Sequence, residues 1–471
     1  MTVTTRRTRR ASSLTRGAGQ DGTREDCPQS AGYVVPVYDV GAAEESPNAS
    51  SRVRRHGWRW VLAAVAAAGV AVLAHNYFLV FFSTFGLFGN GIDTVVYRHG
   101  AGTILTAEPL YEFALFEAGL PFTYPPFAAL TFVPLALMPV PTALAVANMS
   151  NLLLVYLAVL ASWRILGYRG VPTHVVSAGL AIAFTWLEPV RMTIWFGQIN
   201  LLLLVLVLFD LGRPEGSRLR GIGVGIAAGL KLTPAFFVLY LLALRQWRAA
   251  ALAAIAFAAT VAAAFVVVPS DSWTYWTSTM VKAERIGLLS SPANQSMHGI
   301  LARLWAGGDP PMWVWLLCAG SVAALGLWTA ALAYRRGWTL LSLTICGLST
   351  PMVSPFAWGH HWVWCIPLAV LALDFAARRP RWWGYLLPVV LIGPMLAWYF
   401  TDYRGIAAIG IFMFAGPPWL RLLVQLAYPA VFLIVIATTV IAHRTTKQSA
   451  ATADQSQSVH TGGIFRVPRK C

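Results

Sequence analysis

Long apolar runs separated by short polar segments dominate the chain. A run of about twenty apolar residues is long enough to cross a hydrocarbon core of roughly 30 Å. The clear runs are 58–82, 143–166, 221–244, 248–269, 312–334, 360–377, 383–400 and 419–442. Shorter or proline-interrupted runs are 124–140, 173–187, 198–212 and 338–353. The pattern predicts an all-α polytopic membrane protein with about ten to twelve transmembrane helices and short helices in its outer loops.

The composition excludes an ordinary soluble protein. Hydrophobic residues make up 57% of the 471 residues and charged residues only 11%, which is more apolar surface than a soluble fold buries. Residues 1–57 and 443–471 are polar and aperiodic, so we expect disordered cytoplasmic tails on either side of one transmembrane domain, 58–442. The first apolar run is long enough to span, which predicts a retained helix and not a cleaved signal.

The net charge of +16 does not require a nucleic-acid partner, because arginines gather at the ends of apolar runs as the positive-inside rule produces. Four arginines from Arg52 to Arg59 precede the first span, and no Lys or Arg follows from 60 to 97. We therefore place the N-terminus in the cytoplasm. Further inner segments carry Arg245 and Arg248, Arg335 and Arg336, Arg378, Arg379 and Arg381, and His443, Arg444 and Lys447.

Alternation between these anchors places three connections outside, at 83–123, 270–311 and 351–361. Polar and ionisable residues concentrate in these connections. The sequence thus predicts an extracytoplasmic site in a multi-pass plasma membrane protein whose two termini are cytoplasmic. The five cysteines are scattered without a CxxC pair, so we expect neither a disulfide framework nor a metal site.

The middle of the chain resists simple alternation. The arginines at 213–220 and those at 245–248 both belong inside, yet only the run 221–244 lies between them. Either this run is a broken or re-entrant element, as its glycines and Pro234 permit, or the positive-inside rule fails at one loop. We favour twelve simple crossings, and the choice decides whether Glu188, Arg191, Gln198 and Asn200 face the outside.

An acidic residue, Asp93, follows the first span in the segment GIDTVVYRHG. One interpretation is a helix N-cap. The other is a general base at the membrane surface, where partial desolvation raises the pKa of a carboxylate and helps it accept a proton from a sugar hydroxyl. Arg98 lies about one helical turn further on and is a possible partner of the carboxylate by spacing.

Other polar residues interrupt apolar segments. Lys231, in GLKLTP, marks either a site or a water-filled cavity, or it snorkels. Gln198 and Asn200, in FGQIN, are also explained as interhelical hydrogen-bonding groups. Tyr124, in FTYPPF, lies at a stiff proline corner. Asn294 and Gln295 lie in the outer segment SPANQSMHG.

Two adjacent histidines, His360 and His361, lie in SPFAWGHHWVW. Neighbouring residues on a helix point about 100° apart, so the two rings do not readily hold one metal ion. A hydrogen bond or partial charge directed at a phosphate suits them better. The tryptophans around them are typical of an interfacial aromatic belt.

The ordered strings IDTVVYRHGA, FTYPPFAAL, LEPVRMTIWFGQIN, GIAAGLKLTP, NQSMHGILARL and SPFAWGHHWVW resemble the polyprenol-phosphate-mannose-dependent α-(1→2)-mannosyltransferases of glycosyltransferase family 87. The resemblance covers residues 58 to 440 and omits both tails. It implies the membrane-embedded GT-C glycosyltransferase fold, with an essential acidic residue in the first extracytoplasmic loop. Two positions depart from the family pattern, Thr94 after the acidic residue and Met297 in NQSMHG.

The resemblance assigns roles to the polar residues. Asp93 becomes the catalytic base, because it matches the family's acidic position. Residues assigned to the donor phosphate are His360, His361, Lys231 and Arg98. Residues assigned to substrate binding are Tyr124, Gln198, Asn200, Asn294 and Gln295. No metal and no cofactor is expected, since carboxylate clusters with ligand spacing are absent from the sequence.

The implied reaction is a single inverting displacement on a β-linked polyprenyl phosphomannose, which gives an α-linked product. The implied acceptor is a mannosylated membrane lipid such as a phosphatidylinositol mannoside, or a lipomannan branch. The alternative from another class is a transporter or flippase of lipid-linked sugar, which shares the many spans and broken helices. Such proteins usually carry internal repeats, and the two halves of this sequence show none. A catalytically silent scaffold is a third possibility.

Overall fold

The computed structural model of this protein describes residues 47–81, 86–117, 119–282, 287–305, 309–379, 382–401 and 407–461. Residues Arg55–Cys471 form one compact unit. Helices dominate it, and the predicted all-α polytopic fold is confirmed. One small antiparallel sheet pairs β1 (Tyr399–Thr401) with β2 (Ala407–Ile409), with Tyr399 opposite Ile409.

The α-helices are α1 (Pro47–Phe81), α2 (Ile92–Thr106), α3 (Pro126–Ala136), α4 (Val140–Ile165), α5 (Val171–Ala183), α6 (Glu188–Phe196), α7 (Asn200–Leu211), α8 (Ile222–Leu230), α9 (Phe236–Ala243), α10 (Trp247–Val267), α11 (Pro269–Thr277), α12 (Met297–Leu304), α13 (Met312–Arg335), α14 (Thr339–Val353), α15 (Cys365–Arg378), α16 (Trp382–Ile392), α17 (Pro418–Gln425) and α18 (Ala427–Thr461).

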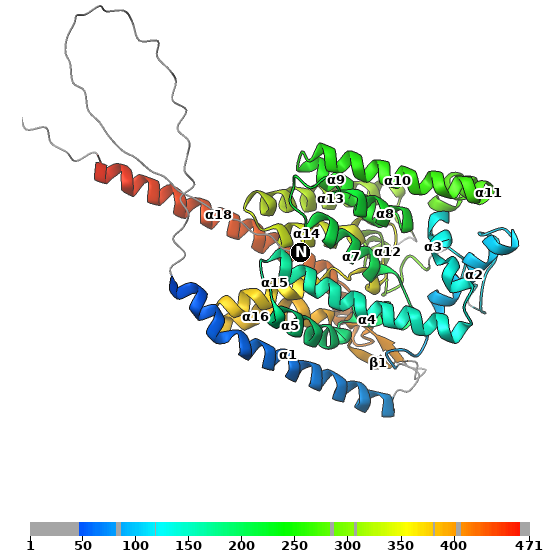
Figure 1. Ribbon diagram of the computed structural model, residues 1–471, viewed down its shortest axis with the longest axis horizontal. Coiled ribbons are helices and arrows are strands. Elements are labelled where there is room, and N and C mark those ends of the chain that lie inside the picture. Colours follow the sequence, from blue (N-terminus) through cyan, green and yellow to red (C-terminus); the bar gives the residue numbers. More distant parts are fainter. Residues whose placement is uncertain are drawn as a thin grey trace, which may run out of the picture. The chain divides into compact units, whose positions relative to one another are not determined.

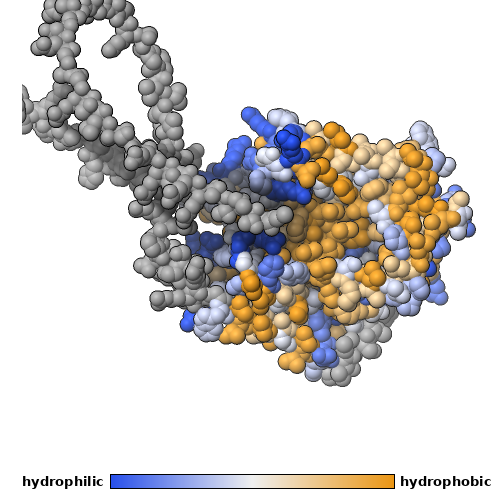
Figure 2. Space-filling view, viewed as in Figure 1, coloured by the Kyte–Doolittle hydropathy of each residue, from blue (hydrophilic) through white to orange (hydrophobic). Residues whose placement is uncertain are grey.

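Long apolar helices establish a multi-pass membrane protein. Within the described residues, five segments are long and apolar enough to cross a bilayer: Trp58–Phe78 of α1, α4, α10, α13 and Ala427–Thr445 of α18. Many of their large side chains are exposed, among them Val266 at 83% and Leu73 at 70%. Apolar side chains cover much of the face in Figure 2, and hydrophilic residues gather toward one end. Lipid tails are the natural neighbours of such a surface.

Several other apolar helices are too short to cross. The 12 residues of α7 rise only about 18 Å at 1.5 Å per residue, against a core of roughly 30 Å. The bend between α6 and α7 is 119°. Short helices also form the pair α8 and α9 and the pair α14 and α15, each joined by a polar turn. The polar turns of these pairs build the candidate site described below.

The run 221–244 is a broken element that returns to the side from which it started. Gly221 lies against Ala249 and Gly229 against Thr260, so α8 runs parallel to α10 (Figure 1). The helix ends at Lys231, and α9 follows after a short 3-10 turn. The other end of the run returns to Gln246, next to where α8 begins. The structure therefore shows the re-entrant alternative and not the simple crossing that we favoured for this run.

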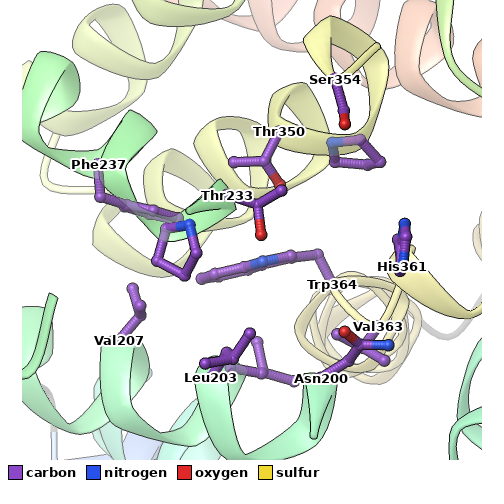
Figure 3. Close-up of a pocket in the computed structure, with 13 residues that line it drawn as sticks. Asn200, Leu203, Val207, Thr233, Phe237, Thr350, Ser354, His361, Val363 and Trp364 are labelled. Atoms are coloured by element: carbon purple, nitrogen blue, oxygen red, sulfur yellow. The ribbon is translucent and has the colours of Figure 1, made fainter. Parts of the chain in front are cut away.

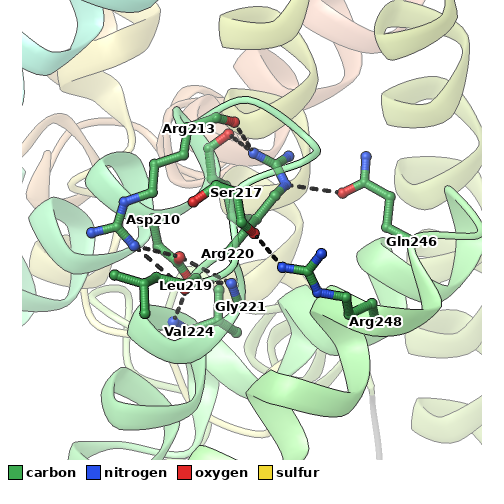
Figure 4. A network of polar contacts seen from close by, with 10 residues as sticks. Asp210, Arg213, Ser217, Leu219, Arg220, Gly221, Val224, Gln246 and Arg248 are labelled. Carbon is green, nitrogen blue, oxygen red and sulfur yellow. Dashed lines mark hydrogen bonds and ion pairs between the residues drawn. The ribbon is translucent and has the colours of Figure 1, made fainter.

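A polar network joins the two ends of this re-entrant element (Figure 4). Arg220 Nε donates to Gln246 Oε1 at 3.1 Å, and Arg248 Nη2 donates to the Ser217 carbonyl at 2.9 Å. Asp210 Oδ2 accepts from the backbone N–H groups of Gly221 and Val224 at the start of α8, at 2.9 and 3.0 Å. The two arginine clusters thus lie at one end of the molecule without any failure of the positive-inside rule.

The structure describes parts of both predicted tails as helix. α1 begins at Pro47, before the predicted start of the first span, and α18 continues to Thr461. Once a helix is nucleated, each further residue costs little, so helix extends past the apolar stretch. The rest of the predicted tails, 1–46 and 462–471, lies outside the described residues.

The three predicted outer connections lie together at the other end. Leu110 N donates to Asp271 Oδ1 at 2.9 Å, which joins the first connection to the second. Ala357 N donates to Asn294 Oδ1 at 3.1 Å, which joins the second to the third. The segments that carry the predicted site residues are therefore neighbours in space.

Candidate active site

Asp93 stands in the first turn of α2 but is not its N-cap. Gly91 occupies the N-cap position with a φ of 77° and makes no side-chain cap hydrogen bond. The N–H of Ile92 is taken by Asn90 Oδ1 at 2.7 Å. The N-cap interpretation of Asp93 is therefore wrong, and its carboxylate is available to other partners.

The start of α2 is docked on the bend between α6 and α7. Gly91 N donates to the Trp195 carbonyl at 2.7 Å, and Thr94 Oγ1 donates to the Gly197 carbonyl at 3.1 Å. Gly197 has a φ of 74°, and a Cβ there would lie 1.9 Å from Thr94 Oγ1, so only glycine fits. Thr94 thus has a structural role in this docking.

Gln198 connects the carboxylate to two tyrosines. Its Nε2 donates to Asp93 Oδ2 at 2.7 Å. Its Oε1 accepts from the hydroxyls of Tyr97 at 2.9 Å and Tyr124 at 2.8 Å. Gln198 and both tyrosines are buried. The predicted residues Asp93, Gln198 and Tyr124 therefore belong to one network.

Lys231 lies in the break between α8 and α9 and faces the same network. Its Nζ lies 3.0 Å from Asn200 Oδ1, 3.1 Å from His361 Nε2 and 3.4 Å from the Tyr124 hydroxyl. An ammonium group has three N–H bonds, so these three acceptors provide one partner for each of them. The side chain points into the protein and does not snorkel to a surface.

The two histidines make different contacts. His361 Nε2 is held by Lys231, while the His360 backbone carbonyl accepts from Asn200 Nδ2 at 3.0 Å and from Thr193 Oγ1 at 3.3 Å. The planes of the His360 and His361 rings are inclined at 85° to each other. The His360 ring is buried against Phe196, and its Nε2 has no hydrogen-bond partner within the described part of the chain.

Three predicted site residues lie outside this network. Arg98 Nε donates to the Met138 carbonyl at 2.9 Å, at the turn between α3 and α4. Asn294 Nδ2 donates to the Leu289 carbonyl at 2.9 Å, in addition to the bond that its Oδ1 accepts from Ala357. Gln295 N donates to the Ala357 carbonyl at 2.7 Å. Asn294 and Gln295 thus tie two outer connections together, and the loop they support carries His360 and His361.

Burial sets the electrostatics of the carboxylate. It raises the pKa of Asp93 from its usual range to about 6, while the Gln198 hydrogen bond and the charge of Lys231 partly offset this effect. Asp93 is accordingly ionised near neutral pH but accepts a proton easily. Such a carboxylate is suited to general base catalysis.

A cavity of about 40 Å³ lies beside the histidine and amide end of the network. Figure 3 shows His361 and Asn200 at one end, the Trp364 ring in the middle, and Phe237 toward the other end. The cavity continues from the polar network into apolar surroundings between α7, α9 and α14. Polar atoms thus line one end of the cavity and apolar side chains the other.

The sequence interpretation missed Tyr97 and Thr193. Tyr97 lies four residues after Asp93, so the helical repeat of α2 places both on one face. That spacing was a usable signal. Thr193, whose hydroxyl contacts the His360 carbonyl, gives no such signal, because its partner is 167 residues away.

Comparison with known proteins adds independent information. The model of Glycosyltransferase family 87 matches residues 122–355. A curated "Polyprenol-phosphate-mannose-dependent alpha-(1-2)-phosphatidylinositol mannoside mannosyltransferase" of Mycobacterium tuberculosis (strain ATCC 25618 / H37Rv) is 35% identical over 359 residues, which are 72% of this chain and 82% of the relative. A protein of the same description from Mycolicibacterium smegmatis is 37% identical over 319 residues, 62% of this chain and 72% of the relative.

A third relative, from Mycobacterium tuberculosis (strain CDC 1551 / Oshkosh), is described as a "Polyprenol-phosphate-mannose-dependent alpha-(1-2)-phosphatidylinositol pentamannoside mannosyltransferase". It is 32% identical over 377 residues, which are 77% of this chain and 85% of the relative. No solved structure matches the chain. The matched relatives are similar to this chain over most of their own length, so the similarity extends beyond a shared local motif.

Proposed function

This chain belongs to glycosyltransferase family 87, and on that premise we propose that it transfers mannose from polyprenyl phosphomannose to the 2-hydroxyl of a mannosylated phosphatidylinositol lipid. The polytopic helical fold is that of a GT-C enzyme. The relatives whose descriptions name this donor and this acceptor class are 32 to 37% identical to the chain. A lipomannan branch presents the same mannosyl hydroxyl and is the second acceptor of the proposal.

One observation carries the proposal: a partly buried carboxylate, Asp93, is held by an amide and lies in one network with the half-buried ammonium group of Lys231. In the proposed reaction the acceptor 2-hydroxyl attacks the anomeric carbon of the donor as Asp93 removes its proton. The bond from that carbon to the phosphate oxygen breaks, and polyprenyl phosphate leaves with the electron pair. One carboxylate suffices, the anomeric configuration inverts, and no covalent enzyme intermediate forms.

The leaving phosphate needs hydrogen-bond donors in a region of low dielectric. We assign this role to His360, because its buried Nε2 has no partner in the described part of the chain. Lys231 uses its N–H bonds on Tyr124, Asn200 and His361, and His361 contacts it through Nε2, so we assign both a supporting role through the field of the ammonium charge. Arg98 stays outside the proposed phosphate site, since its guanidinium donates to Met138.

The proposed site is recessed below the membrane surface on the outer side. The arginine clusters lie at the opposite end of the helices, which the positive-inside rule places in the cytoplasm together with both termini. Gly229, next to the Lys231 turn, lies against Thr260 of α10, and α10 continues seven residues to Val267. At 1.5 Å per residue the turn is roughly 10 Å below that end of α10. A lipid-borne sugar reaches this depth more easily than a sugar restricted to bulk water.

A transporter of lipid-linked sugar is the second candidate, and the re-entrant pair α8 and α9 favours it, because broken helices are typical of transporters. The two functions differ in their product. A transporter moves the donor lipid between leaflets and leaves the acceptor unchanged, whereas a transferase makes a new glycosidic bond.

The test uses the purified full chain in lipid nanodiscs with polyprenyl phosphomannose and a phosphatidylinositol mannoside. EDTA is present, since the proposal includes no metal or other cofactor. We expect a product heavier by one mannose with an α-(1→2) linkage. Asp93→Asn should abolish it, while the matched variant Asp374→Asn, at the arginine end, should retain it. Failure of the wild type to form product, together with movement of the donor lipid across vesicle membranes, would favour the transporter.

A further inference from the structure

We propose that Gln198 is a positioning residue that orients the Asp93 carboxylate, and that Tyr97 fixes the orientation of the Gln198 amide. This inference rests on the proposed function and offers a positioning role for Gln198 in place of the substrate-binding role expected from the sequence. Both ends of the amide are engaged within the protein: Nε2 gives one of its two N–H bonds to Asp93 Oδ2, and Oε1 lies within hydrogen-bond distance of two tyrosine hydroxyls.

The chemistry of the neighbours decides which way the amide faces. If the amide were flipped, its carbonyl oxygen would face a carboxylate oxygen at 2.7 Å, and two acceptors would oppose each other without a proton between them. In the observed orientation the N–H side faces Asp93, and the carbonyl receives hydroxyl protons. An ionised carboxylate therefore selects this orientation.

The tyrosine protons reinforce the same orientation. Lys231 donates to the Tyr124 hydroxyl oxygen at 3.4 Å, so the proton of Tyr124 is directed to Gln198 Oε1 or to the Tyr97 hydroxyl, each of which lies 2.8 Å away. Tyr97 donates to Gln198 Oε1 at 2.9 Å and stacks on Phe132, with ring centroids 4.7 Å apart, which holds its ring in place. Hydrogen bonds in such a chain polarise one another.

The backbone on both sides of the contact is also fixed. Gln198 follows Gly197, whose carbonyl accepts from Thr94 of α2, and α2 carries Asp93 and Tyr97 as well. The carboxylate, the amide and the tyrosine are thus attached to the same docked pair of elements. The amide holds Oδ2 of Asp93, and the described residues give Oδ1 no hydrogen bond. That oxygen is the one that faces an acceptor hydroxyl in the proposed reaction.

A positioning role predicts a loss of turnover with little loss of binding. We expect Gln198→Ala to lower kcat roughly 10- to 100-fold and to leave the KM for both substrates within about twofold. It should also move the acidic limb of the pH profile to higher pH, because the amide hydrogen bond stabilises the ionised carboxylate. Tyr97→Phe should show a smaller loss of kcat with the same pattern.

The combination of the two variants is the decisive measurement. If Tyr97 acts through the Gln198 amide, Tyr97→Phe adds no further loss of kcat in the Gln198→Ala background. The control is Tyr240→Phe, which removes a buried hydroxyl that bonds to Ser342 at 2.9 Å, in the part of α9 that leads to the arginine end. We expect its kcat, KM and pH profile to match the wild type.

The outcomes separate this inference from the proposed function. Wild-type transfer that is lost in Asp93→Asn supports the proposed function whatever Gln198 does. A raised KM in Gln198→Ala with unchanged kcat and pH profile identifies a substrate contact and overturns the positioning role. Additive losses in the double variant overturn the part assigned to Tyr97. If the wild type forms no glycosidic bond, the proposed function fails, and the positioning role fails with it.

Discussion

The Nζ atom of Lys231 lies 3.1 Å from Nε2 of His361, and this contact joins the turn between α8 and α9 to the turn between α14 and α15. While Lys231 is protonated its ammonium group only donates, so in that state the imidazole accepts at Nε2 and carries its proton on Nδ1. His361 is therefore neutral and orients the lysine, while the lysine charge acts on Asp93.

Replacement of Lys231 tests this contact. Lys231→Met keeps much of the side-chain volume but removes the charge that lowers the pKa of Asp93. We expect kcat to fall about tenfold or more, as a misplaced catalytic group commonly produces, and the acidic limb of the pH profile to move upward. The measurement is the rate of mannosyl transfer from pH 5 to 8. An unchanged pH profile would show that the lysine charge does not act on the carboxylate.

The pH dependence of the wild type follows from the raised pKa of Asp93, about 6. A general base must be ionised to accept a proton, so kcat/KM should rise with pH through about 6 and level off above it. The control is the melting temperature over the same pH range, which separates titration from unfolding. An acidic limb near 4 would contradict a desolvated base.

Asp93→Asn should separate activity from stability. Removal of a general base typically costs 10² to 10⁴ in rate. The pKa of Asp93 is higher in the folded protein than in the unfolded chain, so the folded state binds its proton more tightly, and the ionised carboxylate costs stability at neutral pH.

The melting temperature of the Asp93→Asn variant should therefore equal or exceed that of the wild type at pH 7.5. Its advantage over the wild type should grow as pH rises from about 4 to about 6 and then remain constant. Thermal unfolding at several pH values measures this difference. A variant that melts well below the wild type at pH 7.5 would instead indicate a structural role for the carboxylate.

The donor-phosphate role of His360 predicts a specific loss. His360→Ala removes the buried Nε2 that has no protein partner in the described chain. Its backbone carbonyl, which holds Asn200, is kept. We expect kcat to fall roughly 10- to 100-fold, as for the loss of a group that stabilises developing charge. The matched control is His174→Ala on α5, and an equal loss in both variants would rule out a phosphate role.

The re-entrant path of 222–243 predicts the accessibility of its two ends. Gly216→Cys and Trp247→Cys lie at exposed positions on either side of this segment. A membrane-impermeant maleimide should label both only in inside-out vesicles and should label Glu108→Cys only from the other face. Wild-type protein reports the background from native cysteines. Labelling of Gly216→Cys and Trp247→Cys from opposite faces would show instead that the run 221–244 crosses the membrane once.

The class of this protein is readable from its amino-acid pattern alone. Apolar runs of transmembrane length and arginines at their ends act locally, so counting them predicts a polytopic helical protein with a common basic end. The acidic residue after the first span and the family strings were equally readable. Tyr97 was within reach as well, because the helical period alone relates it to Asp93.

The roles of the individual polar residues follow from long-range contacts in the folded protein. Gln198 contacts a residue 105 positions away and Lys231 a residue 130 positions away, and no local pattern encodes such pairs. No local pattern predicts that Arg98 bonds to Met138 either. The run 221–244 has the hydropathy of a membrane-crossing helix, yet its glycines pack it against α10 as a re-entrant element. Hydropathy records the free energy of transfer into lipid, residue by residue. The direction of a helix and the partner of a polar side chain depend on which surfaces meet, and packing decides that.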